Sequence, residues 1–147
     1  MSKIDIFYAD DDADDVFFFN EIVEQVADES EKQINLHIHF NGDKLIENIK
    51  KNKESNGVVF LDINMPCKNG FQILEEIRNE PEINEFPVIM FSTSSSKDNI
   101  DKSQYLGANL YVVKPNNFND FLKMILTFIE INWKNHVPDF NNFIYKT

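Results

Sequence analysis

The sequence predicts an α/β fold in which helices cover both faces of one parallel sheet. Short apolar runs of strand length alternate along the chain with segments whose apolar residues recur at helical spacing, which is the pattern of successive βα units. Several runs are apolar throughout, as expected for parallel strands that are buried on both faces. The length of 147 residues fits a single domain with a sizeable core.

Five strands are expected from the apolar runs. The second alternates apolar residues with His37 and His39, which is the period of a half-buried edge strand. We interpret these two histidines as part of a solvated face rather than as a metal site. In chain order, the expected strands cover residues 4–9, 36–40, 58–61, 88–91 and 110–113.

Five helices are expected between and after these strands, because apolar residues recur there three and four positions apart. The polar segment 28–33 is an expected loop, Gly107 is expected to end the fourth helix, and Asn117 is the expected cap of the fifth. In chain order, the expected helices cover residues 14–27, 43–52, 70–79, 97–105 and 117–134.

The net charge of −11 is concentrated near the N-terminus, where residues 1–31 carry 11 Asp and Glu against one Lys. Nothing resembles the basic patch that nucleic acid requires, so we expect no nucleic-acid partner. No apolar run is long enough to span a membrane, and the acidic N-terminus does not resemble a signal peptide. We therefore expect a cytoplasmic protein without membrane contact. The single cysteine, Cys67, excludes an internal disulfide and is interpreted as an incidental, exposed thiol.

Polar side chains follow four of the five expected strands, and such side chains meet at one edge of a parallel sheet. Three carboxylates brought together there would repel one another, so they require a cation, and a donor set made only of oxygens suits Mg²⁺. These side chains are Asp10 and Asp11 after the first strand, Asp62 after the third, Ser92 after the fourth and Lys114 after the fifth.

A carboxylate, Mg²⁺, an ammonium group and a hydroxyl group are together what phosphoryl transfer to an aspartate requires. Asp62 is the expected nucleophile because it stands alone at the end of the central strand. Asp10 and Asp11 are adjacent and are better placed as metal ligands.

Four segments of the chain resemble the signature segments of the receiver domain of two-component response regulators. They occur in the family's order and spacing, and the resemblance covers about residues 3–133. It implies a flavodoxin-like (βα)5 doubly wound sheet with the strand order 2-1-3-4-5. The loop at 28–33 and the FSTS stretch are further similar to stand-alone receivers of the phytochrome-associated type. The four segments are ADDD at 9–12, FLDINMPCKNG at 60–70, MFSTS at 90–94 and YVVKP at 111–115.

The resemblance implies a stand-alone response regulator, which is a signalling switch or relay rather than an enzyme acting on other substrates. Asp62 would accept a phosphoryl group from a histidine kinase or a histidine phosphotransfer protein. Asp11 and Asp62 would bind Mg²⁺ directly, Asp10 would act through water, and Asn64 would offer its backbone carbonyl. Gly70 matches the turn after the phosphoacceptor.

The resemblance also implies roles for the residues at the ends of the last two strands. Lys114 would hold the phosphoryl group, and its bond to Pro115 would be cis. Ser92 and Tyr111 would form the switch pair, in which the hydroxyl meets a phosphoryl oxygen and the aromatic ring swings inward. Ser92 stands where Thr is commoner, and Asn116 stands where many receivers have an aromatic residue.

Two other chemistries were weighed against this one. Asp10, Asp12, Asp14 and Glu21 have the spacing of a calcium loop, but Asp15 stands where that loop needs Gly. A phosphohydrolase of the haloacid dehalogenase type also uses an aspartate after a strand. That enzyme needs a second aspartate two residues later, where this sequence has an asparagine.

We expect residues 1–135 to form the receiver domain and residues 136–147 to form a tail, with no output domain. The last helix is apolar on more than one side, so it is either covered by other parts of the chain or forms an interface. The aromatic tail would fold back over it, or tail and helix would form a homodimer or kinase-docking surface. A competing hypothesis is a constitutive interaction module that keeps the fold without the chemistry.

Overall fold

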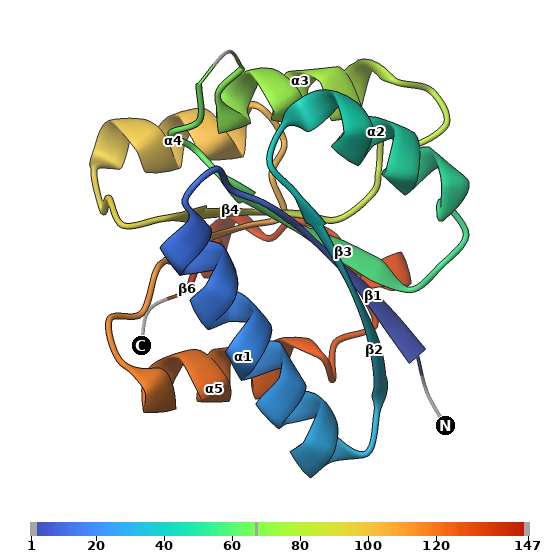
Figure 1. The fold of residues 1–147 in the computed structure, drawn as a ribbon. Helices are drawn as coiled ribbons and strands as arrows, with labels where there is room; N and C mark the ends of the chain where they lie inside the picture. Colours follow the sequence, from blue (N-terminus) through green and yellow to red (C-terminus); the bar gives the residue numbers. More distant parts are fainter. Residues whose placement is uncertain (1–2, 67, 146–147) are drawn as a thin grey trace.

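The structure is a computed structural model that describes residues 3–66 and 68–145 (Figure 1). The expectation for Cys67 lies outside these residues. Among the helices of the described ranges, none has the length and apolar character to cross a membrane. The strands are β1 (Lys3–Ala9), β2 (Gln33–His39), β3 (Gly57–Asp62), β4 (Val88–Ser92), β5 (Leu110–Val113) and β6 (Ile144–Tyr145). The helices are α1 (Ala13–Ser30), α2 (Gly42–Lys51), α3 (Gly70–Asn79), α4 (Lys97–Tyr105) and α5 (Phe118–Phe128), with the 3-10 turns η1 (Trp133–Asn135) and η2 (Phe140–Asn142).

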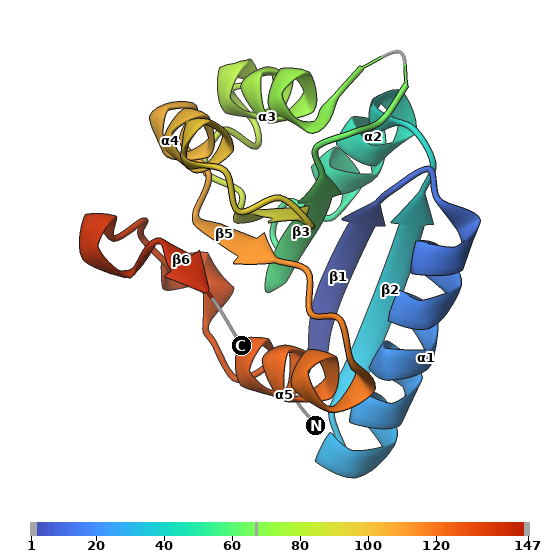
Figure 2. The same cartoon turned by 90° about the vertical axis from the view of Figure 1, so that its left-hand side faces the viewer.

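All six strands run parallel in one sheet with the order β2-β1-β3-β4-β5-β6. Helices α1 and α5 cover one face, and α2, α3 and α4 cover the other (Figures 1 and 2). Ile4, Ile6 and Tyr8 of β1 face α1 and α5, whereas Phe7 and Ala9 belong to the opposite core. The expected order 2-1-3-4-5 is confirmed, but the sheet is not limited to the five strands of a (βα)5 fold because β6 extends it.

Helix α1 is longer than predicted, because the first half of the expected loop at 28–33 is helical and the helix continues to Ser30. The polar residues of this last turn are solvated, and Gln25 Nε2 donates a hydrogen bond to Glu29 Oε1 at 2.9 Å, a pairing that favours a helix. Glu31 then adopts a left-handed conformation with φ of 59°, which ends the helix.

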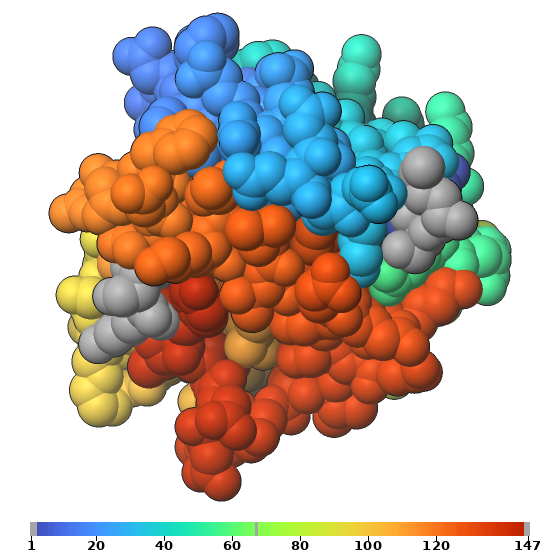
Figure 3. Space-filling view, turned by 90° about the horizontal axis from the view of Figure 1, so that it is seen from below, coloured from blue at the N-terminus to red at the C-terminus, as the bar shows by residue number. Residues whose placement is uncertain are grey.

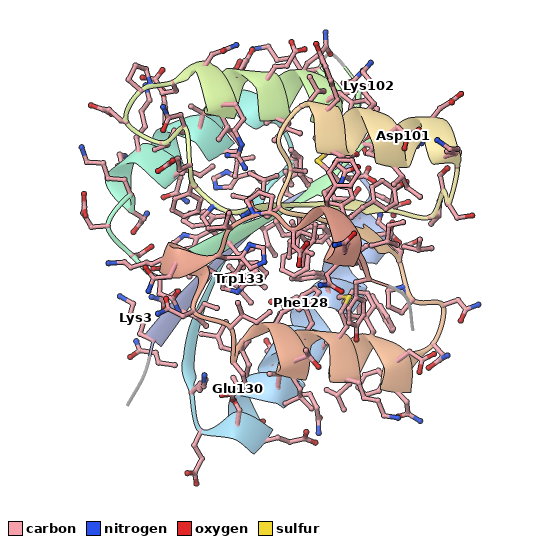
Figure 4. The ribbon with its side chains drawn as sticks, turned by 180° about the vertical axis from the view of Figure 1, so that it is seen from behind. Lys3, Asp101, Lys102, Phe128, Glu130 and Trp133 are labelled. Carbon is pink, nitrogen blue, oxygen red and sulfur yellow. The ribbon has the colours of Figure 1, made fainter. Side chains whose placement is uncertain are left out.

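Helix α5 is shorter than predicted and ends at Phe128 instead of near residue 134. Two side chains capture the carbonyl groups at its end: Lys32 Nζ donates to Ile129 O at 2.8 Å, and Trp133 Nε1 donates to Phe128 O at 2.9 Å. The fully buried Trp133 packs edge-on against the Phe128 ring, and Figure 4 shows the two side chains near each other. These contacts turn the chain into η1.

The tail adds the sixth strand instead of lying over α5 as a whole. Tyr111 N of β5 donates to Phe143 O at 2.9 Å, and β6 continues this pairing along the edge of β5. The Phe143 side chain is buried in the core that contains Tyr111, while the Tyr145 ring contacts the Phe128 ring of α5 at 5.0 Å. Figure 3 shows the tail in red beside α5 in orange.

The two histidines of β2 are half-buried, so their interpretation as a solvated face is wrong. The His37 ring stacks on the Phe7 ring at 4.5 Å, and its Nε2 lies 3.0 Å from Asp5 Oδ1. Asn48 of α2 places its Nδ2 within 3.1 Å of His37 Nδ1 and 3.0 Å of His39 Nε2. The alternation of apolar and polar residues in β2 could not show that α2 packs on the face that carries the histidines, or that Asn48 bonds to them there.

Candidate functional site

The side chains predicted at the strand ends meet at the carboxyl edge of the sheet. Asp10 directly follows β1, Asp62 ends β3, Ser92 ends β4 and Lys114 directly follows β5. Asp10, Asp62 and Ser92 are buried. Parallel strands have brought residues that are up to 104 positions apart into direct contact.

Three carboxylates form a compact cluster at this edge. One oxygen from each of Asp10, Asp11 and Asp62 lies within 4.8 Å of the others. Burial raises the pKa of Asp62 to about 6; the Lys114 ammonium opposes this shift, and the charge of Asp10 adds to it. The donor set is made of oxygens only, and the cluster carries more negative charge than Lys114 balances. Both properties fit a hard divalent cation.

Lys114 is the cation of the site, and three carboxylates surround it. Its Nζ lies 3.1 Å from Asp10 Oδ2, 3.1 Å from Asp15 Oδ2 and 3.4 Å from Asp62 Oδ1. The side chain is only 11% exposed, and Nζ lies 5.4 Å from the centre of the Phe91 ring. Burial alone would lower the pKa of Lys114, but attraction by Asp62 and Asp10 outweighs burial and raises it. The ammonium is therefore charged and directed at the carboxylate cluster.

Two neighbours fix Asp10 in this position. Tyr8 OH donates a hydrogen bond to Asp10 Oδ2 at 2.6 Å, and Asp12 N donates to Asp10 Oδ1 at 3.0 Å. Burial and the charge of Asp10 raise the pKa of Tyr8, which keeps the phenol protonated and able to donate. Each carboxylate oxygen of Asp10 thus accepts one of these hydrogen bonds, and the two bonds fix the orientation of the side chain.

Sequence reasoning missed two residues of this site, Tyr8 and Asp15. The signal for Tyr8 was its position two residues before Asp10, because alternate residues of a strand point to the same side. In the sequence, Asp15 stands out only as the residue at the position where a calcium loop needs Gly. Its position in the first turn after the strand end was the signal that it lies at the same edge.

The two predicted switch residues are joined through the backbone of Ser94. Ser94 N donates to Ser92 Oγ at 3.1 Å, and Tyr111 OH donates to Ser94 O at 2.6 Å. The Tyr111 side chain is fully buried, so its ring lies inward in this structure. The loop after β4 therefore connects the hydroxyl at the site with the aromatic ring of β5.

The loop after β3 packs tightly against the backbone of Asp62. Gly70 N donates to Ile63 O at 2.8 Å, and a Cβ at Gly70 would collide with the carbonyl oxygen of Asp62. Asn64 lies in this loop with an exposed side chain. A residue without a side chain is thus required at position 70 for the loop to close beside the site.

The bond between Lys114 and Pro115 is trans in the structure, so the expected cis bond is wrong. The trans form is the lower-energy form of an X-Pro bond by about 0.5 to 1 kcal/mol. On its N-terminal side, the backbone of Lys114 is held by a hydrogen bond that Lys114 N donates to Ser92 O at 2.7 Å.

The calcium-loop alternative is not compatible with this geometry. Asp12 is the N-cap of α1, and its side chain accepts hydrogen bonds from the backbone N of Asp14 and of Asp15. Glu21 lies more than two turns further along the helix and is exposed. The four acids of the motif are therefore not gathered around one point.

Comparison with known proteins supports the assignment made from the site. Residues 6–126 match the family model of the response regulator receiver domain. Response regulator Rcp1 of Synechocystis sp. is 33% identical over 75 residues, which are 51% of this chain and 51% of that protein. The match thus spans about half the length of this relative.

Solved structures show the same fold. The Mn²⁺-bound form of response regulator Rcp1 superposes with a TM-score of 0.70 at 24% identity, covering 92% of this chain and 98% of that one. The phosphorylated cyanobacterial phytochrome response regulator RcpA gives a TM-score of 0.71 at 23% identity, covering 89% and 94%. The expected similarity to phytochrome-associated receivers is confirmed. Because the family model matches most of this chain, the chain belongs to the response regulator receiver domain family.

Proposed function

We propose that the protein is a phosphorylation-dependent switch or relay in which Asp62 accepts a phosphoryl group from a histidine kinase or a histidine phosphotransfer protein. The observation that carries the proposal is the position of Asp62, which is buried within 3.4 Å of the Lys114 ammonium and within reach of the acidic pair Asp10 and Asp11. A buried carboxylate with one cation and a metal-compatible cluster beside it suits phosphoryl transfer.

The transfer itself requires Asp62 as an ionised nucleophile. Its pKa of about 6 leaves the carboxylate mostly ionised at pH 7. A carboxylate oxygen forms a bond to phosphorus while the bond from phosphorus to the histidine nitrogen breaks, and the electron pair of that bond returns to the imidazole. Lys114 neutralises charge on the phosphoryl oxygens, and the buried setting limits attack by water on the product.

The residues fit Mg²⁺ as the metal of this reaction. Asp11, Asp62 and the backbone carbonyl of Asn64 would hold it, with Asp10 acting through water. When bound, Mg²⁺ supplies the positive charge that three neighbouring carboxylates and a phosphoryl group need.

Phosphorylation adds about two negative charges beside Lys114 and Ser92. We propose that the Ser92 hydroxyl then donates to a phosphoryl oxygen, which changes its bond with Ser94 N. Because Ser94 O accepts the hydrogen bond from Tyr111 OH, the change reaches β5. The downstream protein target would read it on the face formed by Tyr111 and the last helix.

We propose that this switch acts in the cytoplasm as part of a two-component pathway. We propose that residues 1–135 form the receiver and that residues 136–147 are a tail, whose strand β6 pairs with β5. Phe140 and Ile144 of the tail remain exposed, which supports a homodimer through the tail and α5. Light scattering of the full chain at several concentrations tests this part: a mass that stays that of one chain throughout contradicts it.

The first experiment is to incubate the protein with Mg²⁺ and acetyl phosphate and to weigh it intact by mass spectrometry. We expect one phosphate adduct on the wild type, no adduct on Asp62→Asn, and no adduct without Mg²⁺. If the wild type forms no adduct and also fails to bind beryllofluoride, a phosphoryl mimic, the chain is a phosphorylation-independent interaction module and the proposal is wrong.

A further inference from the structure

Lys114 has three carboxylate neighbours, and one of them, Asp15, has no part in the phosphorylation chemistry proposed above. Asp15 lies in the first turn of α1 and places Oδ2 3.1 Å from Lys114 Nζ. We infer that Asp15 competes with the phosphoryl group for the Lys114 ammonium and thereby weakens the phosphorylated state. This inference rests on the proposed function of Asp62 and Lys114.

The contacts of the ammonium define what is in competition. A lysine ammonium has three N–H donors, and here they face Asp10 at 3.1 Å, Asp15 at 3.1 Å and Asp62 at the longer distance of 3.4 Å. A phosphoryl group on Asp62 needs one of these donors. Because Nζ lies closer to Asp15 than to Asp62, a movement of Nζ toward phosphoryl oxygens on Asp62 would lengthen the Asp15 contact.

Asp15 is not needed to keep Lys114 in place. The Lys114 backbone N is held by Ser92 O, the ammonium lies over the Phe91 ring, and the charged hydrogen bond to Asp10 remains when Asp15 is removed. The Asp15 side chain is 47% exposed, so it can return to water when the contact is lost. Asp15 therefore draws the Lys114 ammonium away from Asp62 and is not required to position it.

Charge acts in the same direction. Among the described residues, the contacts at this edge join Asp10, Asp11, Asp15 and Asp62 with one lysine, and phosphorylation replaces the single charge of Asp62 by about two. Removing the Asp15 charge relieves this repulsion without removing a proposed metal ligand. Because the Asp15 side chain is half-exposed, water screens its charge, and we expect its removal to change the affinity for a phosphoryl group by only a few fold.

The test compares Asp15→Asn with Asp14→Asn by calorimetric titration with beryllofluoride in Mg²⁺. Asp14 is exposed in the same turn and is not a partner of Lys114, so its variant removes the same charge from the same helix end. We expect Asp15→Asn to bind the mimic about two- to fivefold more tightly than the wild type, and Asp14→Asn to bind it unchanged. Asp15→Glu keeps the charge and should restore the weaker binding.

A second measurement uses the phosphorylated protein. Its aspartyl phosphate should survive about two- to fivefold longer in Asp15→Asn than in the wild type, and thermal melting shows that all variants are folded. If the wild type binds beryllofluoride but Asp15→Asn binds it equally or more weakly, the competition is wrong while the proposed function stands. If the wild type itself does not bind, the proposed function and this inference fail together.

Discussion

Arg78 and Lys114 are both largely buried cations, but they lie at opposite ends of the sheet and have different partners. Arg78 of α3 donates only to neutral oxygens near the amino ends of β4 and β5: to Gly107 O, to Phe86 O and to Asn109 Oδ1, all within 2.9 Å. Burial lowers the pKa of Arg78 to about 10. Lys114 instead faces three carboxylates, and their charge raises its pKa above the ordinary value.

The difference shows how a stabilising cation can be told from a functional one. Every acceptor around Arg78 is part of the fold and is satisfied by the guanidinium, so the cluster is complete as it stands. Within the part of the chain that the structure describes, the cluster around Lys114 has fewer positive charges than carboxylates, so a positively charged ligand would complete it. An excess of like charge in a buried cluster indicates a binding site, whereas a balanced set of contacts indicates a structural one.

The largest effect is expected when the structural cation is removed. Arg78→Met leaves the carbonyl oxygens of Gly107 and Phe86 without a donor, while Asn109 Oδ1 keeps the hydrogen bond from Val88 N. We expect the free energy of unfolding to fall by about 3 kcal/mol. Urea denaturation measures this loss. Arg78→Lys serves as a control that keeps the charge and part of the bonding, so it should lose less. The affinity of the folded variant for beryllofluoride should be unchanged, because Arg78 lies at the end of the sheet opposite Lys114. A clear loss of affinity would show that the two ends are not independent.

The second effect concerns the pH dependence of the functional end. Asp62 has a pKa of about 6 in the folded protein against an ordinary value of 3.8. The folded state therefore binds this proton more tightly, and the resulting stabilisation is complete below pH 3.8 and lost as the pH rises through about 6.

Without metal, Asp62→Asn should be more stable than the wild type at pH 7.5 by about 2 to 3 kcal/mol, and this difference should shrink toward zero near pH 4. Urea denaturation across this range measures it. Asp14→Asn is the control for the loss of one charge on the same acidic protein. If the wild type is as stable as Asp62→Asn at pH 7.5, the ionised Asp62 carboxylate does not destabilise the folded protein, and the prediction is wrong.

The third effect tests the loop that carries Asp62. Gly70→Ala forces a Cβ against the carbonyl oxygen of Asp62, so we expect about 2 kcal/mol of lost stability and slower phosphorylation by acetyl phosphate. Gly42→Ala is a matched control, because Gly42 also begins a helix but the atoms nearest to its Cβ would belong to the Ile73 side chain and not to the backbone of Asp62. Equal phosphorylation rates in the two variants would contradict a role of Gly70 beside Asp62.

The smallest effect concerns the hydrogen bond that orients Asp10. Tyr8→Phe removes the bond to Asp10 Oδ2 and should lower stability by about 1 kcal/mol, measured by thermal or urea denaturation. Tyr105→Phe alters a phenol that is almost fully exposed, so it should change nothing. A similar result for both variants would mean that Asp10 keeps its orientation through Lys114 and the backbone alone.

The strand ends and their side chains could be predicted because they depend on local patterns. A continuous apolar run marks a buried strand, and in a parallel sheet the residue that follows it, such as Asp62 or Lys114, must lie at the common edge. The predicted bounds of α3 and α4 are likewise confirmed, and in the structure the side chains of Asn69 and Ser96 cap the first turns of these helices.

Other features depend on contacts between distant residues and left no local pattern. Lys32 ends α5 by reaching a carbonyl 97 residues away, which no periodicity of the last helix can reveal. Strand β6 has only two residues and pairs through backbone groups, so its sequence carries no strand period. Asp15 became part of the site only because α1 turns its first residues toward the lysine that follows β5.

The pairing of β6 with β5 also bears on how the protein avoids self-association through its sheet. Strand β5 consists of the apolar residues LYVV, and a strand of this kind at an open edge is a template for intermolecular sheet growth and amyloid-like aggregation. The tail occupies that edge and moves the boundary of the sheet to a strand of two residues, which offers few backbone groups for templating. Chains cut before residue 143 would therefore expose β5 and aggregate from the native state.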